Sequence, residues 1–225
     1  RDDALLACDE AVMLKRAIKA VAQQQGVQAS FMAKPFAEQA GNGLHIHVSV
    51  LDEAGNNIFA STPDAPANTL KHAIGGLQRS AKDSLLLFAP HANSYRRFVL
   101  NAFVPLNDAW GYNNRTVAMR IPHSNEANTR IEHRIAGADA NVYLVTAAVL
   151  AGMLHGLENG FDPGPPVVGN AYEQTEIRTP YWRQAIDDFM DSDFIRDQFG
   201  EPFRHIYGQQ KLKEIRVRPK TGGHD

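Results

Sequence analysis

The stretch 41–50 places polar side chains at a spacing that could serve chemistry. His45, His47 and Ser49 alternate with apolar residues, so on a strand the three share one face because side chains change faces at every residue. Neutral imidazole is a common metal ligand and can hydrogen-bond to phosphate oxygen. Two glycines at the start of the stretch let a backbone or a ligand approach closely. A histidine on a strand is also often a plain surface residue, so the residue types leave a ligand site and a structural role open.

The stretch 129–135 carries a second polar face of a different kind. Arg130, Glu132 and Arg134 share one side of a strand, while residues 131, 133 and 135 share the other. A carboxylate between two arginines is typical of an ion-pair ladder. The same arrangement can bind anions or a metal ion, and the residue types alone do not choose between these roles.

Short strands and longer helices are expected to position these residues. The predicted strands are 28–34, 44–50, 115–122 and 129–135, with a turn at 52–57 that makes a hairpin after the second. The predicted helices run from Asp2 or Asp3 to Gln25, from Asn68 or Thr69 to about Phe88, from Ala140 to Glu158, from Tyr181 to Met190 and from Phe194 to about Ile215. Residues 91–114 are expected to be irregular but ordered and functional, and 162–166 to be a linker.

Composition limits the class of protein. The chain has 225 residues, a net charge of −2 and 44% hydrophobic residues, which suits one large domain or part of a larger one. A charge near zero without a basic run argues against a nucleic-acid binder. The single cysteine, Cys8, excludes an intrachain disulfide and favours a reducing compartment. The apolar run 140–157 includes Asn141 and His155 and is expected to be a core helix rather than a membrane span.

Several motifs, in order along the chain, resemble one family. The residues Gly-Asn-Gly-Leu-His-Ile-His-Val-Ser at 41–49, preceded by Lys34-Pro35, resemble the ATP-binding signature of glutamine synthetases. Later motifs follow in the family's order: Asn93-Ser94-Tyr95-Arg96-Arg97, Asn114-Arg115, Arg120-Ile121-Pro122, Arg130-Ile131-Glu132-His133-Arg134 and Ala140-Asn141-Val142-Tyr143-Leu144. The resemblance spans about residues 5–212, and residues 109–116 and 132–140 are most similar to the γ-glutamylpolyamine (γ-glutamylputrescine) synthetase branch.

The resemblance implies an α+β fold with a curved, mainly antiparallel sheet backed by helices. Residues 1–225 would form the C-terminal part of a glutamine-synthetase-type catalytic domain. The chain begins without an initiator methionine, and we expect the family's N-terminal domain, with a strand of paired metal-binding glutamates, to precede Arg1. The implied reaction uses ATP to convert the side-chain carboxylate of glutamate to an acyl phosphate, which an amine attacks to form an amide. This part of the domain is expected to be inactive alone.

The resemblance also implies which residues hold the metal and ATP. By position, His45 and Glu132 would hold the divalent ion that bridges the ATP phosphates. Magnesium-type ions prefer oxygen and accept few protein ligands. His47 and Ser49 would contact ATP.

Arginines would manage the negative charges of the implied substrates. Arg120 and Arg130 would contact the ATP phosphates, and Arg115 would act catalytically on the transferring phosphoryl group. Charge stabilisation and positioning carry most phosphoryl-transfer catalysis. Arg97 and Arg134 would clamp the carboxylates of glutamate, which the planar guanidinium fork suits.

The same resemblance implies cofactors and partners for the full-length parent. ATP and Mg²⁺ or Mn²⁺ would be the cofactors, and glutamate and an amine, favoured to be a polyamine such as putrescine, the substrates. The parent is expected to be cytoplasmic and a ring-type homo-oligomer such as a dodecamer, without nucleic-acid or membrane partners.

The chain departs from the family's pattern at several positions. Phe103 stands where ammonia-using members carry a glutamate, and an aromatic side chain there suits a larger amine with methylene groups or a stacked cation. Gly41 would offer its backbone to glutamate, but Ala40 replaces an asparagine expected just before it. Thr129 stands where the family often has an arginine, and the tail 215–225 lacks the family's acidic, aromatic ending.

Three alternatives remain beside a polyamine ligase. The first is glutamine synthetase itself, with ammonia as the acceptor, against which Phe103 counts. The second is a non-catalytic homologue with a scaffold or regulatory role, which would have no need of His45, Glu132 and the arginines. The third is an unrelated histidine-rich metal hydrolase, which the expected clamp of Arg97 and Arg134 disfavours.

Overall fold

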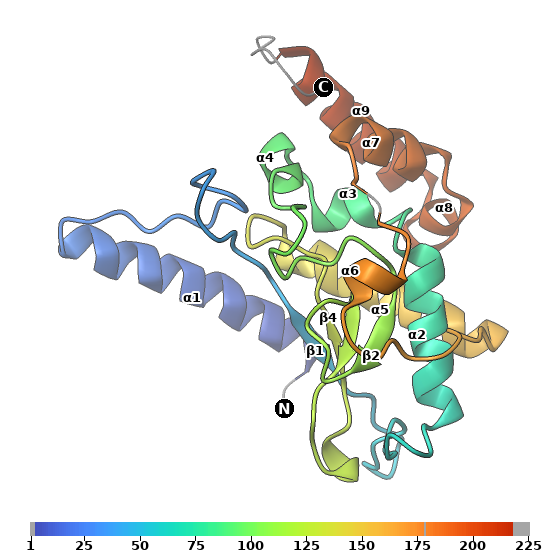
Figure 1. Ribbon diagram of the computed structural model, residues 1–225. Helices are drawn as coiled ribbons and strands as arrows, with labels where there is room; N and C mark the ends of the chain where they lie inside the picture. The colour runs from blue at the N-terminus through green and yellow to red at the C-terminus, as the bar shows by residue number, and fades with distance from the viewer. Residues whose placement is uncertain (1–2, 178, 218–225) are drawn as a thin grey trace.

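The computed structural model describes residues 3–177 and 179–217 and has the expected α+β class. Within this part of the chain a small sheet lies at the centre, with helices behind it and long loops in front (Figure 1). The strands are β1 (Ile46–Val48), β2 (Trp110–Tyr112), β3 (Met119–Ile121) and β4 (Ile131–His133), in the spatial order β1-β4-β3-β2. β4 pairs antiparallel with β1 and β3, and β2 pairs parallel with β3, so the sheet is mainly antiparallel as predicted.

The hydrophobic core lies between the sheet and the helices behind it. These helices are α2 (Asn68–Ser80), α3 (Leu85–Phe88) and α5 (Val142–Asn159). Met119 and Ile131 of the strands are fully buried in one apolar cluster with Phe88. α2 and α5 cross closely, because a Cβ on Gly76 would lie 2.1 Å from the carbonyl oxygen of Gly152. This packing immobilises one face of the sheet and leaves the polar face toward the loops.

The central apolar helix α5 is the predicted core helix. Asn141 caps its start by accepting hydrogen bonds from the N–H groups of Tyr143 and Leu144, and the left-handed Gly160 follows its end. Among the described residues it is the helix that is long and apolar enough to cross a membrane, with a mean hydropathy of 1.2. Its Val145 and Val149 are fully buried in the core cluster. Packing in the core therefore accounts for the apolar composition of this helix.

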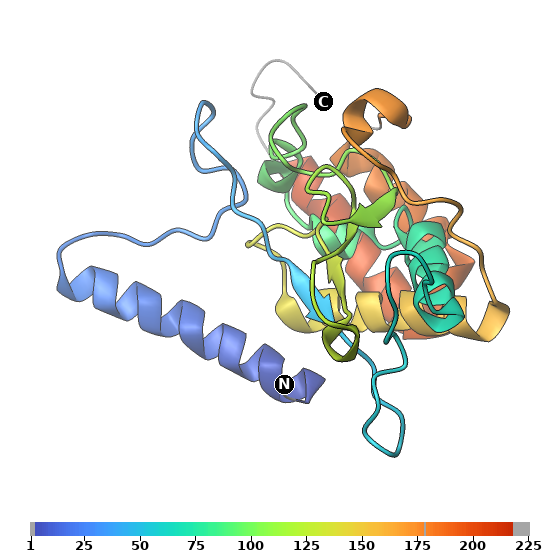
Figure 2. The same ribbon diagram turned by 60° about the horizontal axis from the view of Figure 1, so that its bottom comes forward.

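The N-terminal helix α1 (Ala4–Gln24) projects from the body instead of packing along it (Figures 1 and 2). Asp3 caps it by accepting from the N–H of Leu5 at 2.8 Å, and Gly26, at φ 71°, follows its end as predicted. Near the start, Cys8 is buried against α5, with Sγ 3.3 Å from Thr146 Oγ1. Much of α1 leaves apolar side chains exposed: Leu5, Leu6, Met13, Leu14, Ile18 and Val21.

The C-terminal helices pack together at one end of the body (Figure 1). They are α7 (Trp182–Asp191), α8 (Asp193–Phe199) and α9 (Glu201–Val217), preceded by the short α6 (Ala171–Gln174). The predicted helix 194–215 is therefore two helices, because Gly200 between them takes φ 86°. Phe189 of α7 and Tyr207 of α9 join the two helices with ring centroids 5.5 Å apart.

The segment 28–34, predicted to be a strand, is not one. The backbone of Lys34 instead exchanges two hydrogen bonds of 2.9 Å with the side-chain amide of Asn93. The carbonyl oxygen of Ala33 accepts from the N–H of Asn42 at 2.8 Å. These hydrogen bonds go to a side chain and a loop, so this segment forms no strand ladder.

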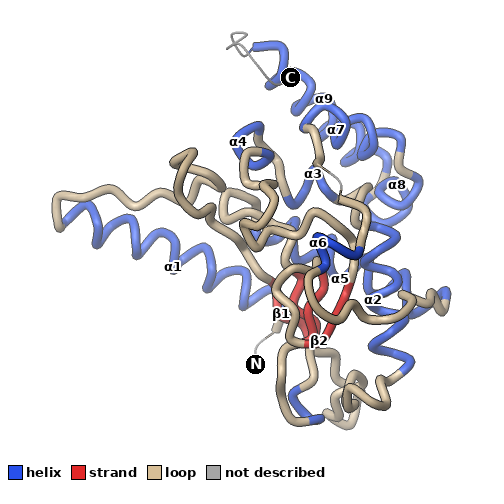
Figure 3. Tube along the Cα trace, in the orientation of Figure 1, coloured by secondary structure: helices blue, strands red, loops and turns tan. Residues whose placement is uncertain are grey.

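Loops occupy much of the remaining chain, and several elements are shorter than predicted (Figure 3). The predicted helix 68–88 is interrupted after Ser80 and resumes as α3. The stretch 91–114, expected to be irregular, contains α4 (Ala92–Tyr95) and β2. The predicted hairpin after β1 is confirmed by the bridge between Leu51 and Asn57.

Candidate functional site

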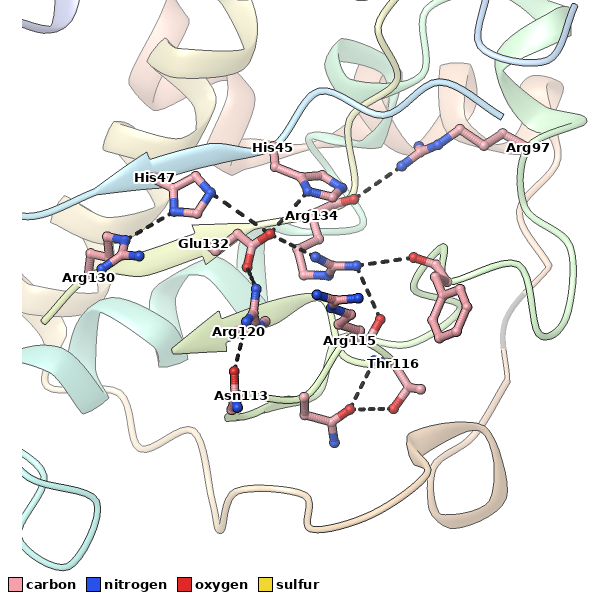
Figure 4. Close-up of polar contacts among 12 residues, drawn as sticks. His45, His47, Arg97, Asn113, Arg115, Thr116, Arg120, Arg130, Glu132 and Arg134 are labelled. Carbon is pink, nitrogen blue, oxygen red and sulfur yellow. Dashed lines mark hydrogen bonds and ion pairs between the residues drawn. The ribbon is translucent and has the colours of Figure 1, made fainter. Parts of the chain in front are cut away.

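A row of polar side chains crosses the sheet on the face away from the core. In the strand register His47 of β1 lies opposite Glu132 of β4, and Glu132 lies opposite Arg120 of β3. Residues that face one another across strands point to the same side of a sheet. The alternation of the sequence is thus realised in the fold, and the side chains converge on Glu132 (Figure 4).

Glu132 is the centre of this cluster and is only 3% exposed. Its Oε1 accepts from Arg134 Nη1 at 2.7 Å, and its Oε2 accepts from Arg120 Nη1 at 2.8 Å. His45 Nδ1 lies 3.1 Å from the same Oε1, and His47 Nε2 lies 3.9 Å from it. The side chains of His45 and Glu132 therefore converge, as the metal assignment requires.

The surroundings keep Glu132 ionised and His47 neutral. Burial acts to raise the pKa of the Glu132 carboxyl, but hydrogen bonds from His45 and Arg120 and the charges of Arg134 and Arg120 outweigh it and lower the pKa to about 2. Burial lowers the pKa of His47, and the opposing charge of Glu132 is too weak to restore it. At neutral pH the site therefore presents a carboxylate beside an uncharged imidazole.

The arginines surround this carboxylate in distinct ways (Figure 4). Arg134 is buried, and its Nη2 also donates to the carbonyl oxygens of Arg115 at 3.2 Å and Phe103 at 3.3 Å. Arg130 Nε donates to His47 Nδ1 at 3.3 Å, which leaves the proton of the neutral imidazole on Nε2. The side chain of Arg115 is exposed and points toward the cluster. Four guanidinium groups of this cluster therefore accompany one carboxylate, an excess of positive charge that suits a polyanion.

Arg97 lies at the margin of the cluster and is 3% exposed. Its Nη1 donates to the carbonyl oxygen of Ile135 at 2.6 Å and its Nη2 to that of Arg134 at 3.2 Å. Gly41 packs on it, because a Cβ there would lie 3.0 Å from Arg97 Cγ. Burial lowers the pKa of Arg97 to about 10, although the charge of Asp139 opposes the shift. In this conformation Arg97 braces the chain after β4, and its contact with glutamate stays a prediction.

Two further predicted residues lie outside the ionic cluster. Phe103 is 62% exposed and joins the site through its carbonyl oxygen, which accepts from Arg134. Ser49 follows the end of β1 at Val48. Their contacts with an amine and with ATP stay predictions.

The donor set of the cluster fits part of a divalent-ion site. His45 Nδ1 and Glu132 Oε1 are close enough to share one ion. Carboxylate oxygen suits Mg²⁺ and Mn²⁺, and neutral imidazole nitrogen is a common metal ligand. Among residues 3–177 and 179–217 no group of three or more His, Cys, Asp or Glu side chains has a metal-binding arrangement. A complete coordination shell would therefore need further ligands from phosphate, water or other protein groups.

Sequence reasoning missed the role of the loop 113–116, which supports the cluster from the β2 side. Asn113 Oδ1 accepts from Arg120 Nη2 at 2.8 Å and so holds the guanidinium that binds Glu132. Asn113 has φ 50°, a conformation that asparagine tolerates better than most residues. The Asn113-Asn114 pair is a sequence signal for such a turn, but only the fold identifies its partner.

Comparisons with known proteins identify the family of this chain. The family model described as glutamine synthetase, catalytic domain, matches residues 1–221. Gamma-glutamylputrescine synthetase PuuA of Escherichia coli is 42% identical over 95% of this chain and 46% of the relative. Glutamate–isopropylamine ligase of a Pseudomonas species is 38% identical over 96% of this chain and 48% of the relative.

A solved structure has the same fold. The GmaS/ADP complex superposes with a TM-score of 0.85 at 30% identity, over 98% of this chain and 54% of that one. The chain thus spans about half the length of the relatives it matches. Since the family model covers residues 1–221 of the 225, the chain belongs to the glutamine synthetase catalytic-domain family.

Proposed function

We propose that this chain is part of the catalytic unit of an ATP-dependent ligase that joins the side-chain carboxylate of glutamate to an amine. The observation that carries the proposal is the row His47, Glu132 and Arg120 across three strands, with His45 and Arg134 on the same carboxylate. A purely structural ladder would not need two imidazoles, one of them kept neutral, on its exposed side.

The arginines suit the charges of this reaction. Arg115 is exposed beside the cluster, so it can contact a transferring phosphoryl group without leaving a buried ion pair. Arg120 and Arg134 are bound to Glu132 and held in place, so their positive charge requires no reorganisation when negative charge develops nearby. His47, neutral with its proton on Nε2, can donate a hydrogen bond to a phosphate oxygen.

His45 and Glu132 would hold the divalent ion, which when bound neutralises phosphate charge. In the reaction, an oxygen of the glutamate side chain bonds to the γ-phosphorus of ATP as the bond to ADP breaks. The amine nitrogen then bonds to the carbonyl carbon, the carbon–oxygen bond to phosphate breaks, and the amine loses a proton. The residues of this chain contribute by orienting phosphates and stabilising negative charge.

The acceptor amine is proposed to be a polyamine such as putrescine. Phe103 supplies an exposed ring at the margin of the site, and its carbonyl oxygen is tied to Arg134. Each buried methylene of a diamine contributes about 0.8 kcal/mol, and an ammonium group can sit against the ring face. Ammonia has no methylenes and would need a nearby base, which a phenylalanine cannot provide. The name of PuuA, a gamma-glutamylputrescine synthetase, supports the same acceptor.

The test is amine-dependent phosphate release by the complete protein that contains this chain. With ATP and glutamate present, kcat/KM should favour putrescine over ammonia, and Phe103→Glu should narrow that preference because the new carboxylate can accept a proton. A preference for ammonia would assign glutamine synthetase proper. Absence of turnover with either amine would favour a non-catalytic homologue.

The isolated chain is expected to remain at background in the same assay. His45 and Glu132 alone offer too few ligands to hold Mg²⁺, which gives up its water reluctantly. Turnover on the order of 1 s⁻¹ or above by the isolated chain would mean that the site has been misplaced.

A ring-type homo-oligomer is proposed for the complete protein. The exposed apolar side chains of α1, including Met13 and Leu14, support contact with further protein. The molar mass of the complete protein in solution, measured by light scattering, tests this. A monomer would contradict it.

A further inference from the structure

The segment 164–175, here called the strap, is more firmly attached than a linker. It crosses in front of β2 and includes α6 (Figure 1). Trp110 Nε1 donates to the carbonyl oxygen of Gly164 at 3.0 Å, and the N–H of Val167 donates to the carbonyl oxygen of Trp110 at 2.8 Å. The sequence suggested a linker at 162–166, but these hydrogen bonds to Trp110 show that the segment is a packed part of the domain.

The strap also covers the end of the polar row on the sheet. Gly111 of β2 is opposite Arg120 in the register and is therefore the next position of the row that contains Glu132. A Cβ on Gly111 would lie 2.6 Å from the carbonyl oxygen of Val167, so this glycine allows the strap to approach. The side chain of Asn114, in the loop before Arg115, donates to the carbonyl oxygen of Gly169 at 2.8 Å.

The far end of the strap reaches the loop that carries Phe103. Thr116 Oγ1 accepts from the N–H of Ala171 at 2.9 Å, which places the start of α6. From the next residue, the Tyr172 hydroxyl donates to the carbonyl oxygen of Val104 at 2.7 Å, and Tyr172 is 8% exposed. Val104 directly follows Phe103, so the strap is bonded to the backbone beside the proposed acceptor-facing ring.

The Phe103 loop, residues 99–104, needs external support. Asn101 has φ 61° and Phe103 has φ 54°, and a bulky aromatic residue rarely adopts this left-handed conformation. Strained backbone of this kind persists where its surroundings hold it. Two donors act on successive carbonyls of the loop: Arg134 on Phe103 and Tyr172 on Val104.

We propose that Tyr172 is a positioning residue that sets the place of Phe103 and thereby the choice of acceptor amine. The effect on amine choice rests on the proposed function, whereas the role of Tyr172 in holding the loop rests on its hydrogen bond to Val104 alone. Arg134 holds the loop from the cluster around Glu132, whereas Tyr172 holds it from the strap. The Tyr172 hydroxyl can therefore set the position of Phe103 without a hydrogen bond to any residue of that cluster. Tyr172 touches no reacting atom and acts through the backbone of the loop.

The first experiment tests the geometry in this chain and needs no activity. In Tyr172→Phe, amides of 99–106 should exchange with deuterium about fivefold faster, the change expected from losing one hydrogen bond. Tyr143→Phe is the matched control, because it removes a hydroxyl bonded to Asp9 far along the chain from this loop. Thr116→Val should also speed exchange of these amides, since it removes the side-chain acceptor that holds the N–H of Ala171, the residue before Tyr172.

The second experiment tests the consequence in the complete protein. Tyr172→Phe should lower kcat/KM for putrescine about 10- to 100-fold through a raised KM for the amine, while KM for ATP stays within about twofold, since misplacement by about 1 Å can cost a factor of 10². A global loss of packing would instead lower the melting temperature and raise both KM values together, and that result would overturn the proposal.

The outcomes separate this proposal from the function on which it rests. Unchanged exchange of 99–106 in both Tyr172→Phe and Thr116→Val overturns the positioning role whatever the reaction is. Faster exchange with an unchanged ratio of kcat/KM between putrescine and ammonia overturns the role in amine choice. If the wild-type complete protein has no ligase activity, the proposed function fails, and the exchange measurement still decides whether Tyr172 holds the loop.

Discussion

The ionic face around Glu132 and the loop around Phe103 lie next to each other, but they are held by different forces. Glu132 sits on a central strand, is buried, and is bound by two arginines through charge-assisted hydrogen bonds. Phe103 is exposed on a loop with a positive φ, and neutral carbonyl groups are its points of attachment. Moving Glu132 would break two charge-assisted hydrogen bonds in a buried place, whereas the exposed Phe103 loop can shift at a smaller cost.

This difference suits the two halves of the proposed reaction. In the proposed reaction ATP and glutamate carry the negative charges, so their site benefits from side chains fixed by strands and charge. The amine is the variable substrate, and a loop is the part of a fold that tolerates change. Arg134 belongs to both regions, because it donates to Glu132 and to the carbonyl oxygen of Phe103.

The largest effect is expected from removing the charge at the centre of the ionic face. Glu132→Gln leaves Arg134 and Arg120 beside a neutral amide, and the free energy of unfolding at pH 7 should fall by about 3 kcal/mol. Denaturant unfolding of the chain measures this, with exposed Glu126→Gln as the control. A loss below about 1 kcal/mol, the contribution of a single hydrogen bond, would mean that the charged contacts of Glu132 stabilise the fold no more than one hydrogen bond of the loop does.

The same comparison predicts a pH dependence. The pKa of Glu132 in the folded protein, about 2, lies below its ordinary value of 4.5. Its stabilisation is therefore complete above about pH 4.5 and is lost as the pH falls toward 2, by up to about 3 kcal/mol in total. The difference in unfolding free energy between wild type and Glu132→Gln should accordingly shrink between about pH 5 and about pH 3. A difference that stays constant over this range would contradict the depressed pKa.

A smaller effect is expected where the two regions join. Arg134→Lys keeps the charge but loses the fork, so it cannot bond Glu132 and the carbonyl oxygens of Phe103 and Arg115 together. We expect a loss of about 2 kcal/mol in unfolding free energy and faster hydrogen exchange in the loop 99–104. Arg130→Lys, at a less buried position, should change neither measurement appreciably. Equal losses of unfolding free energy in Arg134→Lys and Arg130→Lys would contradict the role of Arg134 as the link between Glu132 and the Phe103 loop.

The smallest effect concerns the loop alone and has the opposite sign. Phe103→Asn should stabilise the chain by about 0.5–1 kcal/mol, because asparagine tolerates the left-handed conformation better than phenylalanine and the exposed ring contributes little burial. Phe36→Asn is the control, since Phe36 is 68% exposed and does not have a positive φ. Thermal unfolding should show a higher melting temperature for Phe103→Asn alone. Destabilisation by both variants would mean that the Phe103 backbone carries no strain.

The strand-borne part of the site is more predictable from the sequence than the loop-borne part. The period of two places His45 and His47 on one face of a strand, and Glu132 with its arginines on one face of another, from sequence positions alone. On a strand the face to which a side chain points follows from its position in the sequence, because successive side chains alternate between the two faces. The α+β class, the core helix α5 and the hairpin after β1 follow from equally local patterns.

Some local patterns were insufficient where hydrogen bonds had a choice of partner. The alternation at 28–34 predicted a strand, but Asn93, 59 residues after Lys34, supplies the hydrogen bonds that a neighbouring strand would have provided. The predicted helix 194–215 had the right composition, but Gly200 allowed the backbone to break and turn. At 28–34 a partner distant in sequence decided the structure, and at 200 a single backbone angle did so. In both segments the local sequence alone did not discriminate between the alternatives.

The sequence by itself determined which residue types are available and which of them share a strand face, because both depend only on neighbours along the chain. Tertiary structure alone decided that Glu132 meets His45, that Arg134 reaches the carbonyl oxygen of Phe103, and that Tyr172 is bonded to Val104. The residues of the last pair are 68 positions apart. Such contacts depend on strand register, on the approach that Gly111 allows, and on the course of the strap, and no short-range pattern encodes these distances.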